Sequence, residues 1–408
     1  MILKSLCDLY WLLLSQGRVA PEGYSLTKVH RVISLNEDGS IINIKSISPQ
    51  KWILLNVPEQ KVRTRNISSH FLCDTFDYFL SPGKQRDASA VLHKKLLSGI
   101  NCPAAKAVCA FFDRPAEAPP VSQDSAKYVF EYGGHFVHDD PMIVQAWIDQ
   151  KQFGGSMGRC CITGEVGPLT DTHPKIKDVP GTIALGGAAV SYNLDAAESF
   201  GLEGSANAPI GVKTAFAYSS ALNYLLSSQS RHWEYNNFAL VCWAENGDLA
   251  YQNAFFTMLF PPRDLEGSDI VSAMLSAGYL TTSDGELLSR DMPMFVLGVS
   301  GNAGRIAFPL FCRVTFGDLL DQFSAYHARM SVPHPPWEPE FITLLDILNE
   351  ISGPGRNQHA PMPLIYALIR CIIEGTDYPR LLHNLVVSLH KPGRISASVI
   401  QLFKGGEV

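Results

Sequence analysis

The start of the chain follows the repeat of an amphipathic helix. Apolar side chains recur three and four positions apart from Ile2 to Leu14, and Pro21 with Gly23 end the pattern. Asp8 interrupts the apolar run and no small-residue cleavage site follows, which argues against an export signal. We therefore predict a core helix here.

Strand periodicity then predicts β-hairpins. VHRVISL (29–35) and IINIKSI (41–47) alternate apolar and polar positions around an Asp-Gly turn. MFVLGVSGNAGRIAFPLF (294–311) contains two apolar runs around a Gly-Asn turn. Further strands are expected at residues 52–57, 126–132 and 238–244.

Helical periodicity predicts helices at residues 71–81, 91–99, 104–112, 141–150, 213–228 and 316–330. Proline-rich breaks stand at residues 114–125 and 332–340. The expected fold is α+β, with a mixed N-terminal region of antiparallel hairpins and several helices followed by a helical C-terminal segment. The breaks predict an N-terminal α+β domain (1–113), a central α+β domain with the glycine-rich loop (126–330) and a helical segment (341–408).

Composition is typical of a soluble globular protein. Hydrophobic residues make up 46% of the chain and the mean hydropathy is +0.04. No stretch reaches the ~18–20 apolar residues of a membrane-spanning helix. Nine scattered cysteines without an export signal favour reduced thiols. We expect a cytoplasmic protein with no membrane contact.

The net charge of −6 argues against a protein that simply coats nucleic acid. The charges are uneven, because residues 51–100 hold eight Lys and Arg against four Asp and Glu. A local basic region can still meet phosphates, although an uneven but solvated surface explains the same numbers.

Two segments carry the candidate nucleic-acid contacts. In KVRTRNISSHF (61–71), alternating basic residues would project from one side of an extended chain, and short polar groups and a phenylalanine follow. THPKIKDVPGTIALGGAAVSYN (172–193) places two lysines before a glycine pair. An ordinary solvated loop is the alternative for both. The candidate contact residues are Lys61, Arg63, Arg65, Asn66, Ser68, His70, Phe71, Lys175, Lys177, Gly186, Gly187, Ser191 and Asn193.

A hydrolase serine is the first catalytic alternative. GGSMG (154–158) matches the G-x-S-x-G turn, which needs a strand before the serine and a helix after it. Gly164, Gly167 and Pro168 block a helix after Ser156, so we favour a plain loop.

A metal site is the second catalytic alternative. HFVHDD (135–140) brings His135, His138, Asp139 and Asp140 together, but the pattern suits a strand end better than a helix. Cys160 and Cys161 are adjacent and lack C-x-x-C spacing. No phosphate-binding glycine motif occurs, so we expect no metal and no cofactor.

A co-linear set of motifs resembles the large subunit of the type I-C CRISPR surveillance complex (Cascade). That family has a Cys-x-x-Thr-Gly-Glu element, His-Pro-x-Ile-Lys, a glycine-rich turn, a Val-Ser-Phe-Asn-like strand and an Ala-Leu-Asn-x-Leu-Leu helix. All appear here in order, within CCITGEVGPLTDTHPKIKDVPGTIALGGAAVSYN (160–193) and KTAFAYSSALNYLL (213–226). MILKSLCDLY, RNISSHFLCDTFDYFLS, VLGVSGNAGRIAF and EGTDYPRLLHNLV also look like family landmarks.

The resemblance implies a non-catalytic subunit that recognises the protospacer-adjacent motif in double-stranded DNA. It would promote duplex opening and R-loop formation and help recruit the nuclease–helicase. The expected partners are CRISPR RNA, the backbone, small and processing subunits, the target duplex and the nuclease–helicase. A stand-alone serine or metal-dependent hydrolase and a purely structural assembly piece remain the alternatives.

If the chain has the function that the resemblance implies, the candidate contact residues would have different roles. The basic residues would neutralise phosphates, while the glycine pair would let the backbone approach a groove. Asn66, His70, Ser191 and Asn193 would meet base edges, and Phe71 would wedge into a base step.

Two features depart from the family pattern. Ser69-His70-Phe71-Leu72 stands where the family tends to have Pro-Asn-Phe-Leu, so His70 would replace the asparagine or the sequence preference would differ. The family also continues into a helical domain that resembles the small subunit, and residues 341–408 look like the approach to it.

Overall fold

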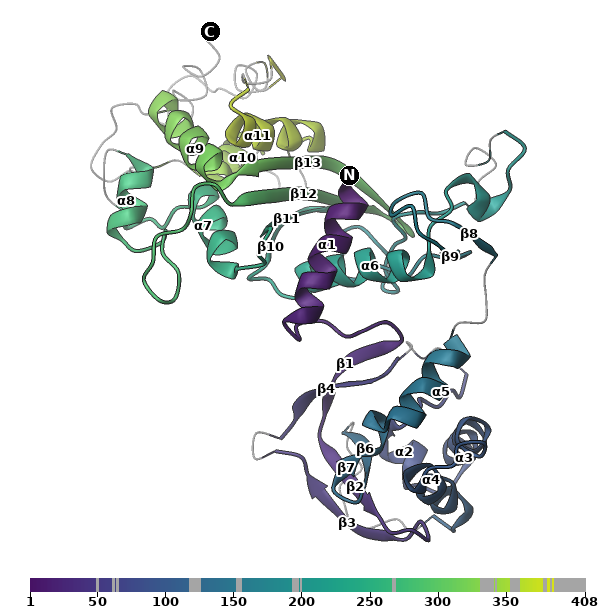
Figure 1. Ribbon diagram of the computed structural model, residues 1–408. Coiled ribbons are helices and arrows are strands. Elements are labelled where there is room, and N and C mark those ends of the chain that lie inside the picture. Colours follow the sequence, from purple (N-terminus) through teal and green to yellow (C-terminus); the bar gives the residue numbers. More distant parts are fainter. Residues whose placement is uncertain are drawn as a thin grey trace. The chain divides into compact units, whose positions relative to one another are not determined.

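The computed structural model describes residues 1–48, 51–60, 63, 66–116, 126–151, 156–192, 198, 200–265, 269–330, 341, 343–352, 360–376, 380–381 and 384. The chain forms two compact units. Unit 1 takes in the described residues of 1–12, 172–197 and 218–408, and unit 2 those of 13–171 and 198–217. Both combine helices and sheets, which confirms a mixed α+β fold (Figure 1).

Unit 2 contains a mixed five-stranded sheet. Its strands are β2 (Arg31–Leu35), β3 (Ile41–Ser46), β5 (Cys73–Thr75), β6 (Lys127–Tyr132) and β7 (His135–Phe136). The order is β3-β2-β6-β5, with β7 also paired to β6. β2 and β3 form the predicted antiparallel hairpin, whereas β2 and β6 are parallel. The helices are α2 (Phe76–Phe79), α3 (Lys84–Leu97), α4 (Pro103–Asp113), the 3₁₀ turn η1 (Val137–Asp139) and α5 (Pro141–Lys151).

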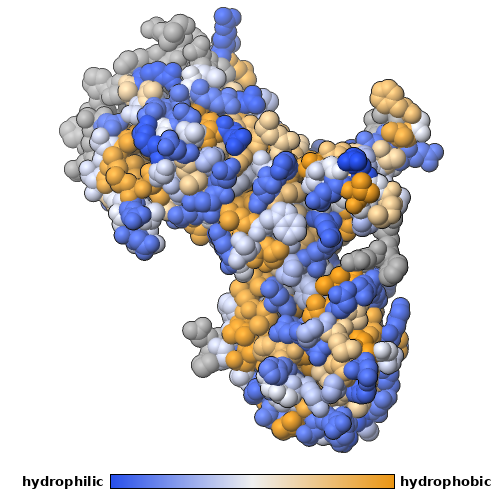
Figure 2. All heavy atoms as spheres, viewed as in Figure 1, coloured by the Kyte–Doolittle hydropathy of each residue, from blue (hydrophilic) through white to orange (hydrophobic). Residues whose placement is uncertain are grey.

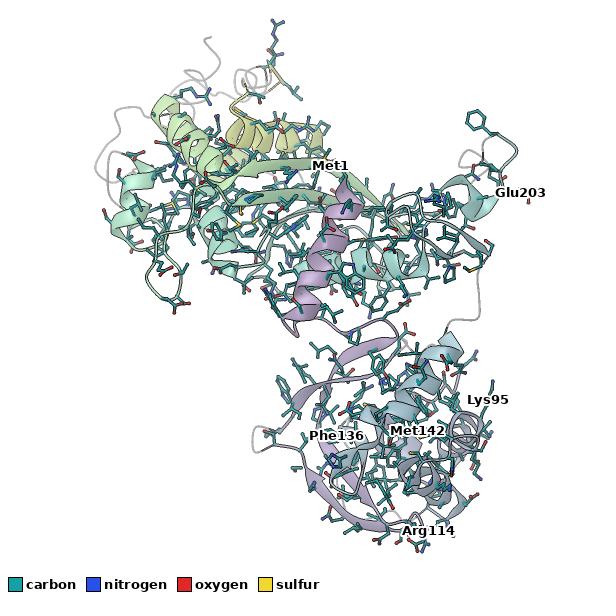
Figure 3. All side chains as sticks on the ribbon, in the orientation of Figure 1. Met1, Lys95, Arg114, Phe136, Met142 and Glu203 are labelled. Atoms are coloured by element: carbon teal, nitrogen blue, oxygen red, sulfur yellow. The ribbon has the colours of Figure 1, made fainter. Side chains whose placement is uncertain are left out.

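The two faces of this sheet pack into different cores, because successive side chains of a strand point to opposite faces. Ile33 and Phe130 join a core with residues of α2, α3 and α4. Val32 and Val129 join a second core with Val57 of a two-stranded ribbon. Arg114, labelled in Figure 3, lies at the end of α4. Its guanidinium pairs with Asp38 in the β2–β3 turn (3.1 Å).

The ribbon pairs β1 (Tyr24–Val29) with β4 (Ile53–Pro58) in antiparallel register. Leu26 and Leu54 on its strands and Trp52 beside it are exposed. Figure 2 shows hydrophobic residues gathered over this ribbon. Unit 2 also contains a small hairpin of β8 (Met157–Arg159) and β9 (Val166–Pro168), and the 3₁₀ turn η3 (Gly204–Asn207).

Unit 1 contains a four-stranded antiparallel sheet in the order β10-β11-β12-β13. The strands are β10 (His232–Tyr235), β11 (Phe238–Ala244), β12 (Pro293–Asn302) and β13 (Arg305–Thr315). Every residue of β11 is buried, as expected of a strand covered on both faces. The helices α7 (Leu249–Leu259), α8 (Ile270–Ser276), α9 (Phe316–Met330), α10 (Leu344–Ile351) and α11 (Met362–Glu374) supply residues to the core on one face.

Two further helices, α1 (Ile2–Ser15) and α6 (Val212–Leu226), lie where the sequence predicts them. The helix predicted over residues 71–81 is wrong in its first half. Leu72 has a left-handed φ of 54°, and the Asp74 carboxylate accepts hydrogen bonds from the backbone N–H groups of His70 and Thr75 (both 2.8 Å). This local bonding competes with helix formation, so the strand β5 precedes the short helix α2.

In the C-terminal region the described residues include α10 and α11, in line with the helical prediction for this segment. Across the part of the chain that the structure describes, we find no helix with the length and apolarity needed to span a membrane.

Candidate nucleic-acid interface

The glycine-rich segment 172–192 of unit 1 lies against the turn of the β12–β13 hairpin. Thr182 pairs with Ala303 and Ala188 pairs with Arg305 in isolated β-bridges. The Ala188 N–H donates to the carbonyl of Gly304 (2.9 Å). A hairpin distant in sequence therefore fixes the path of the loop.

The base of this loop is closed by a third bridge, between Ile176 and Gly187. Ile176 and Gly187 exchange two backbone hydrogen bonds of 2.8 and 2.9 Å. The turn between them, from residue 177 to 186, is thereby held as a closed loop rather than a free linker.

Asn223 of α6 fixes the backbone that carries the two lysines. Its Oδ1 accepts from the Lys177 N–H (2.8 Å), and its Nδ2 donates to the Lys175 carbonyl (3.4 Å). Both lysine side chains are exposed, and within the described residues neither ammonium group forms an ion pair. Two cations on a fixed backbone suit phosphate contacts.

Packing inside unit 1 explains why residues 186 and 187 are glycines. Gly186 has φ +84°, and a Cβ there would lie 2.3 Å from the Ile176 carbonyl oxygen. A Cβ on Gly187 would lie 2.7 Å from Cγ1 of Ile306. Both glycines are buried, so their close approach is to the protein's own chain, whereas the sequence suggested an approach to a groove.

The tip of the loop presents apolar side chains that the sequence analysis missed. Ile183 is 51% exposed and Leu185 is 53% exposed, directly before the glycine pair. Arg305, also exposed, is the first residue of β13, directly after the adjoining hairpin turn. The apolar run TIAL inside a polar segment was the available signal for the tip. Nothing local indicated Arg305, because its position depends on long-range pairing.

His173 of the His-Pro-x-Ile-Lys element is a buried structural residue. Its Nδ1 lies 2.6 Å from the Tyr218 hydroxyl, and its Nε2 lies 3.4 Å from the Tyr192 hydroxyl. Burial lowers the pKa of His173, so the ring is neutral at physiological pH. It holds the start of the loop against α6.

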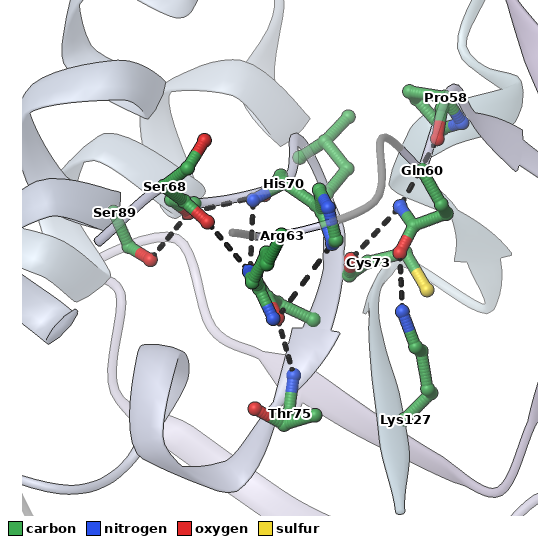
Figure 4. Close-up of polar contacts among 12 residues, drawn as sticks. Pro58, Gln60, Arg63, Ser68, His70, Cys73, Thr75, Ser89 and Lys127 are labelled. Atoms are coloured by element: carbon green, nitrogen blue, oxygen red, sulfur yellow. Dashed lines mark hydrogen bonds and ion pairs between the residues drawn. The ribbon is translucent and has the colours of Figure 1, made fainter. Parts of the chain in front are cut away.

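Arg63 of the other candidate segment, 61–71, lies in unit 2, and its guanidinium pairs with a carboxylate of the same unit. Its guanidinium pairs with the buried carboxylate of Asp74 and stacks 3.8 Å from the centroid of the Tyr78 ring. Its Nε donates to the Ser68 carbonyl (2.6 Å), a hydrogen bond that Figure 4 shows. In this arrangement Arg63 organises the loop, and its charge is already paired.

The other candidate contact residues of segment 61–71 differ in how exposed their side chains are. Asn66 and Ser68 are exposed, whereas His70 is 8% exposed and Phe71 is 2% exposed. Phe71 stacks on Trp147 with ring centroids 5.2 Å apart, so in this conformation the ring is not available to a base step. Ser191 of the other segment is exposed. Lys61, Arg65 and Asn193 lie outside the described residues.

The catalytic alternatives gain no support. Ser156 is followed by the strand β8, not by the helix that a nucleophile turn requires. His138 is buried, and Asp140 accepts a hydrogen bond from the Met142 N–H (2.9 Å) at the start of α5. Among the described residues no group of three or more His, Cys, Asp and Glu is placed to hold a metal.

The Cys-x-x-Thr-Gly-Glu element forms a closed turn in unit 2. The Cys160 N–H donates to the Glu165 carbonyl, and the Gly164 N–H donates to the Cys160 carbonyl (2.8 and 2.9 Å). Burial raises the pKa of the Cys160 thiol, but its hydrogen bonds with Gly211, Thr214 and Thr163 outweigh burial and lower the pKa to about 6.

Comparison with known protein families identifies the family of the chain. No curated protein matches the chain. The family model described as "CRISPR-associated protein (Cas_Csd1)" matches residues 6–406. This match covers nearly the whole chain, including the closed Cys160 turn, the glycine-rich loop and α6. The chain therefore belongs to the Cas_Csd1 family, the large subunit of the type I-C Cascade complex.

Proposed function

We propose that this subunit recognises the protospacer-adjacent motif in double-stranded DNA, promotes duplex opening and R-loop formation, and helps recruit the nuclease–helicase. In RNA-guided complexes base pairing with the guide reads the target, and protein reads the short adjacent motif. One observation carries the proposal. Lys175 and Lys177 are exposed cations on a backbone fixed by Asn223, in the same loop as an exposed apolar tip, and among the described residues neither forms an ion pair.

The lysines would bind backbone phosphates and supply affinity without sequence information. Ser191, on the same segment, would meet base edges. Ile183 and Leu185 take over the wedge role that the sequence suggested for Phe71, because they are exposed and Phe71 is buried. An apolar tip supported by a hairpin can enter a base step without first leaving a core.

The lysine pair gives the direct test. In the assembled complex with guide RNA, the Lys175→Ala/Lys177→Ala variant should bind target duplexes more weakly whatever the flanking sequence. The slope of log affinity against log salt should fall by about one unit per lysine, because each neutralised phosphate releases counterions. Binding titrations at four salt concentrations measure both quantities.

The matched control removes two other exposed lysines, Lys84 of α3 and Lys106 of α4. This variant loses the same charge and should keep the parent slope. If the parent and the Lys175→Ala/Lys177→Ala variant had equal slopes of log affinity against log salt, the two lysines would not be part of the DNA interface.

A further inference from the structure

A cavity of about 300 Å³ lies in unit 2. Its walls include Glu59, Ser68, Ser69, Phe71, Trp147 and Gln150. The volume is at the lower end of small-molecule sites, ~300–1,000 Å³, and is large enough for one heteroaromatic ring system.

An aromatic pair supplies a flat wall of this cavity. Phe71 and Trp147 are stacked with ring centroids 5.2 Å apart and an angle of 22° between their planes. The Trp147 indole N–H donates to the Gly23 carbonyl (2.8 Å), which fixes the orientation of the ring. Bases stack on such fixed aromatic faces with little dependence on sequence.

The polar groups of the walls fit the edge of a base better than a phosphate. The Glu59 carboxylate can accept hydrogen bonds from base N–H groups and would repel a phosphate. The Ser68 hydroxyl and the Gln150 amide, both on exposed residues, add donors and acceptors at the rim. Aromatic stacking with edge hydrogen bonds is the way proteins hold unstacked bases.

Residues 68–71, which form one wall of the cavity, and Leu72 directly after them are held by hydrogen bonds within unit 2. Asp74 accepts from the His70 N–H (2.8 Å) and pairs with Arg63. The Leu72 N–H donates to Nε2 of His93 (2.9 Å). A site built on such bonds loses little conformational entropy when a ligand binds.

We propose that this cavity holds one unpaired nucleobase of single-stranded DNA. The proposal rests on the proposed function, because duplex opening would supply the unpaired strand. The side chains that meet the base would be Trp147, Glu59, Ser68 and Gln150, with Phe71 stacked on Trp147.

The test uses the full chain and short single-stranded oligonucleotides that carry one 2-aminopurine, whose emission is quenched by stacking. Parent protein should quench the probe, and Trp147→Leu should lose the quenching and bind roughly tenfold more weakly. Trp147→Phe should restore much of both. Trp52→Leu is the matched control, since Trp52 is an exposed tryptophan of the same unit beside the β1–β4 ribbon.

Gln150→Ala gives a second variant at an exposed rim residue, where folding is not at risk, and should also weaken binding. Parent-like binding and quenching by Trp147→Leu and Gln150→Ala would overturn the proposal. Equal Trp147-dependent binding of an oligoribonucleotide would overturn the assignment to DNA. The salt slope of the Lys175→Ala/Lys177→Ala variant on duplex DNA is independent, so failure here leaves the proposed function standing.

Discussion

Asp74 is fully buried, and its carboxylate accepts backbone hydrogen bonds from His70 and Thr75 while pairing with Arg63. Removing a partner of a buried ion pair leaves an uncompensated charge and unsatisfied backbone groups. We expect Asp74→Ala to lower the free energy of unfolding by about 3–5 kcal/mol. Urea unfolding followed by circular dichroism measures the change.

Asp113 supplies the control for this variant. It pairs with Lys94, but its side chain is 65% exposed, so solvent screens the pair. Asp113→Ala should cost no more than about 1 kcal/mol. Similar losses for the two variants would mean that the Asp74 network does not stabilise the unit.

His93 gives a pH prediction. It is fully buried, and burial lowers its pKa to about 4 from 6.5. Below pH 6.5 the unfolded chain binds a proton that the folded chain does not, so this contribution to stability falls as pH drops towards 4. The loss is on the order of 3 kcal/mol over that range.

The measurement is the urea midpoint at pH 7.5, 6.5, 5.5 and 5. His93→Gln should flatten this dependence, while part of it should remain because burial also lowers the pKa of His327 to about 4. His135→Gln, at an exposed site, should keep the parent dependence. A parent-like pH profile for His93→Gln would contradict the account.

Single residues also show what the sequence could and could not predict about the site. Lys175 and Arg63 look alike in the sequence as basic residues near polar ones. Only the fold separates an exposed cation from one paired with a buried carboxylate. The sequence likewise suggested Phe71 as a wedge, yet Phe71 is buried and stacks on Trp147, which is distant in sequence.

At the scale of the element, the glycine-rich loop depends on Gly186. An alanine there would have to adopt φ +84° and place Cβ 2.3 Å from the Ile176 carbonyl oxygen. We expect Gly186→Ala to open the bridge between Ile176 and Gly187, because strain and clash act together. Hydrogen exchange at those two amides should become faster by tenfold or more, a change of about 1.4 kcal/mol in the opening free energy.

Gly164→Ala is the control for this variant, because it introduces backbone strain without a steric clash. Gly164 has φ +77°, but no atom lies within 4 Å of a Cβ there. Its effect should be confined to the turn before β9. Unchanged protection of Ile176 and Gly187 in Gly186→Ala would show that the loop tolerates a side chain at that glycine.

Elements defined by local pattern were predictable. The β2–β3 and β12–β13 hairpins, α5, α6 and α9 all lie where periodicity and turn residues place them. The pairing of β1 with β4 and the parallel pairing of β2 with β6 join segments far apart in sequence, and no local pattern encodes them. The β-bridge between Ala188 of the glycine-rich loop and Arg305 is also a long-range pairing that no local pattern encodes.

At the scale of the whole molecule, membership in the Cas_Csd1 family places the chain in a complex with other Cas subunits. The order of the motifs along the chain predicted this family more sharply than composition, charge or any single motif. The contact residues are a separate question, because a family resemblance locates loops and not the atoms that meet DNA.

Site-specific cross-linking tests the central claim most directly. A photoreactive phenylalanine analogue is placed at Leu185, which is 53% exposed at the loop tip, and the complex with guide RNA is irradiated on target DNA. The same analogue at Val91, 69% exposed on α3 of unit 2, is the control position. The account predicts that position 185 cross-links to the base pairs of the adjacent motif and that position 91 does not. Cross-links from position 185 that avoid the motif, or none at all on DNA that the complex binds, would contradict it.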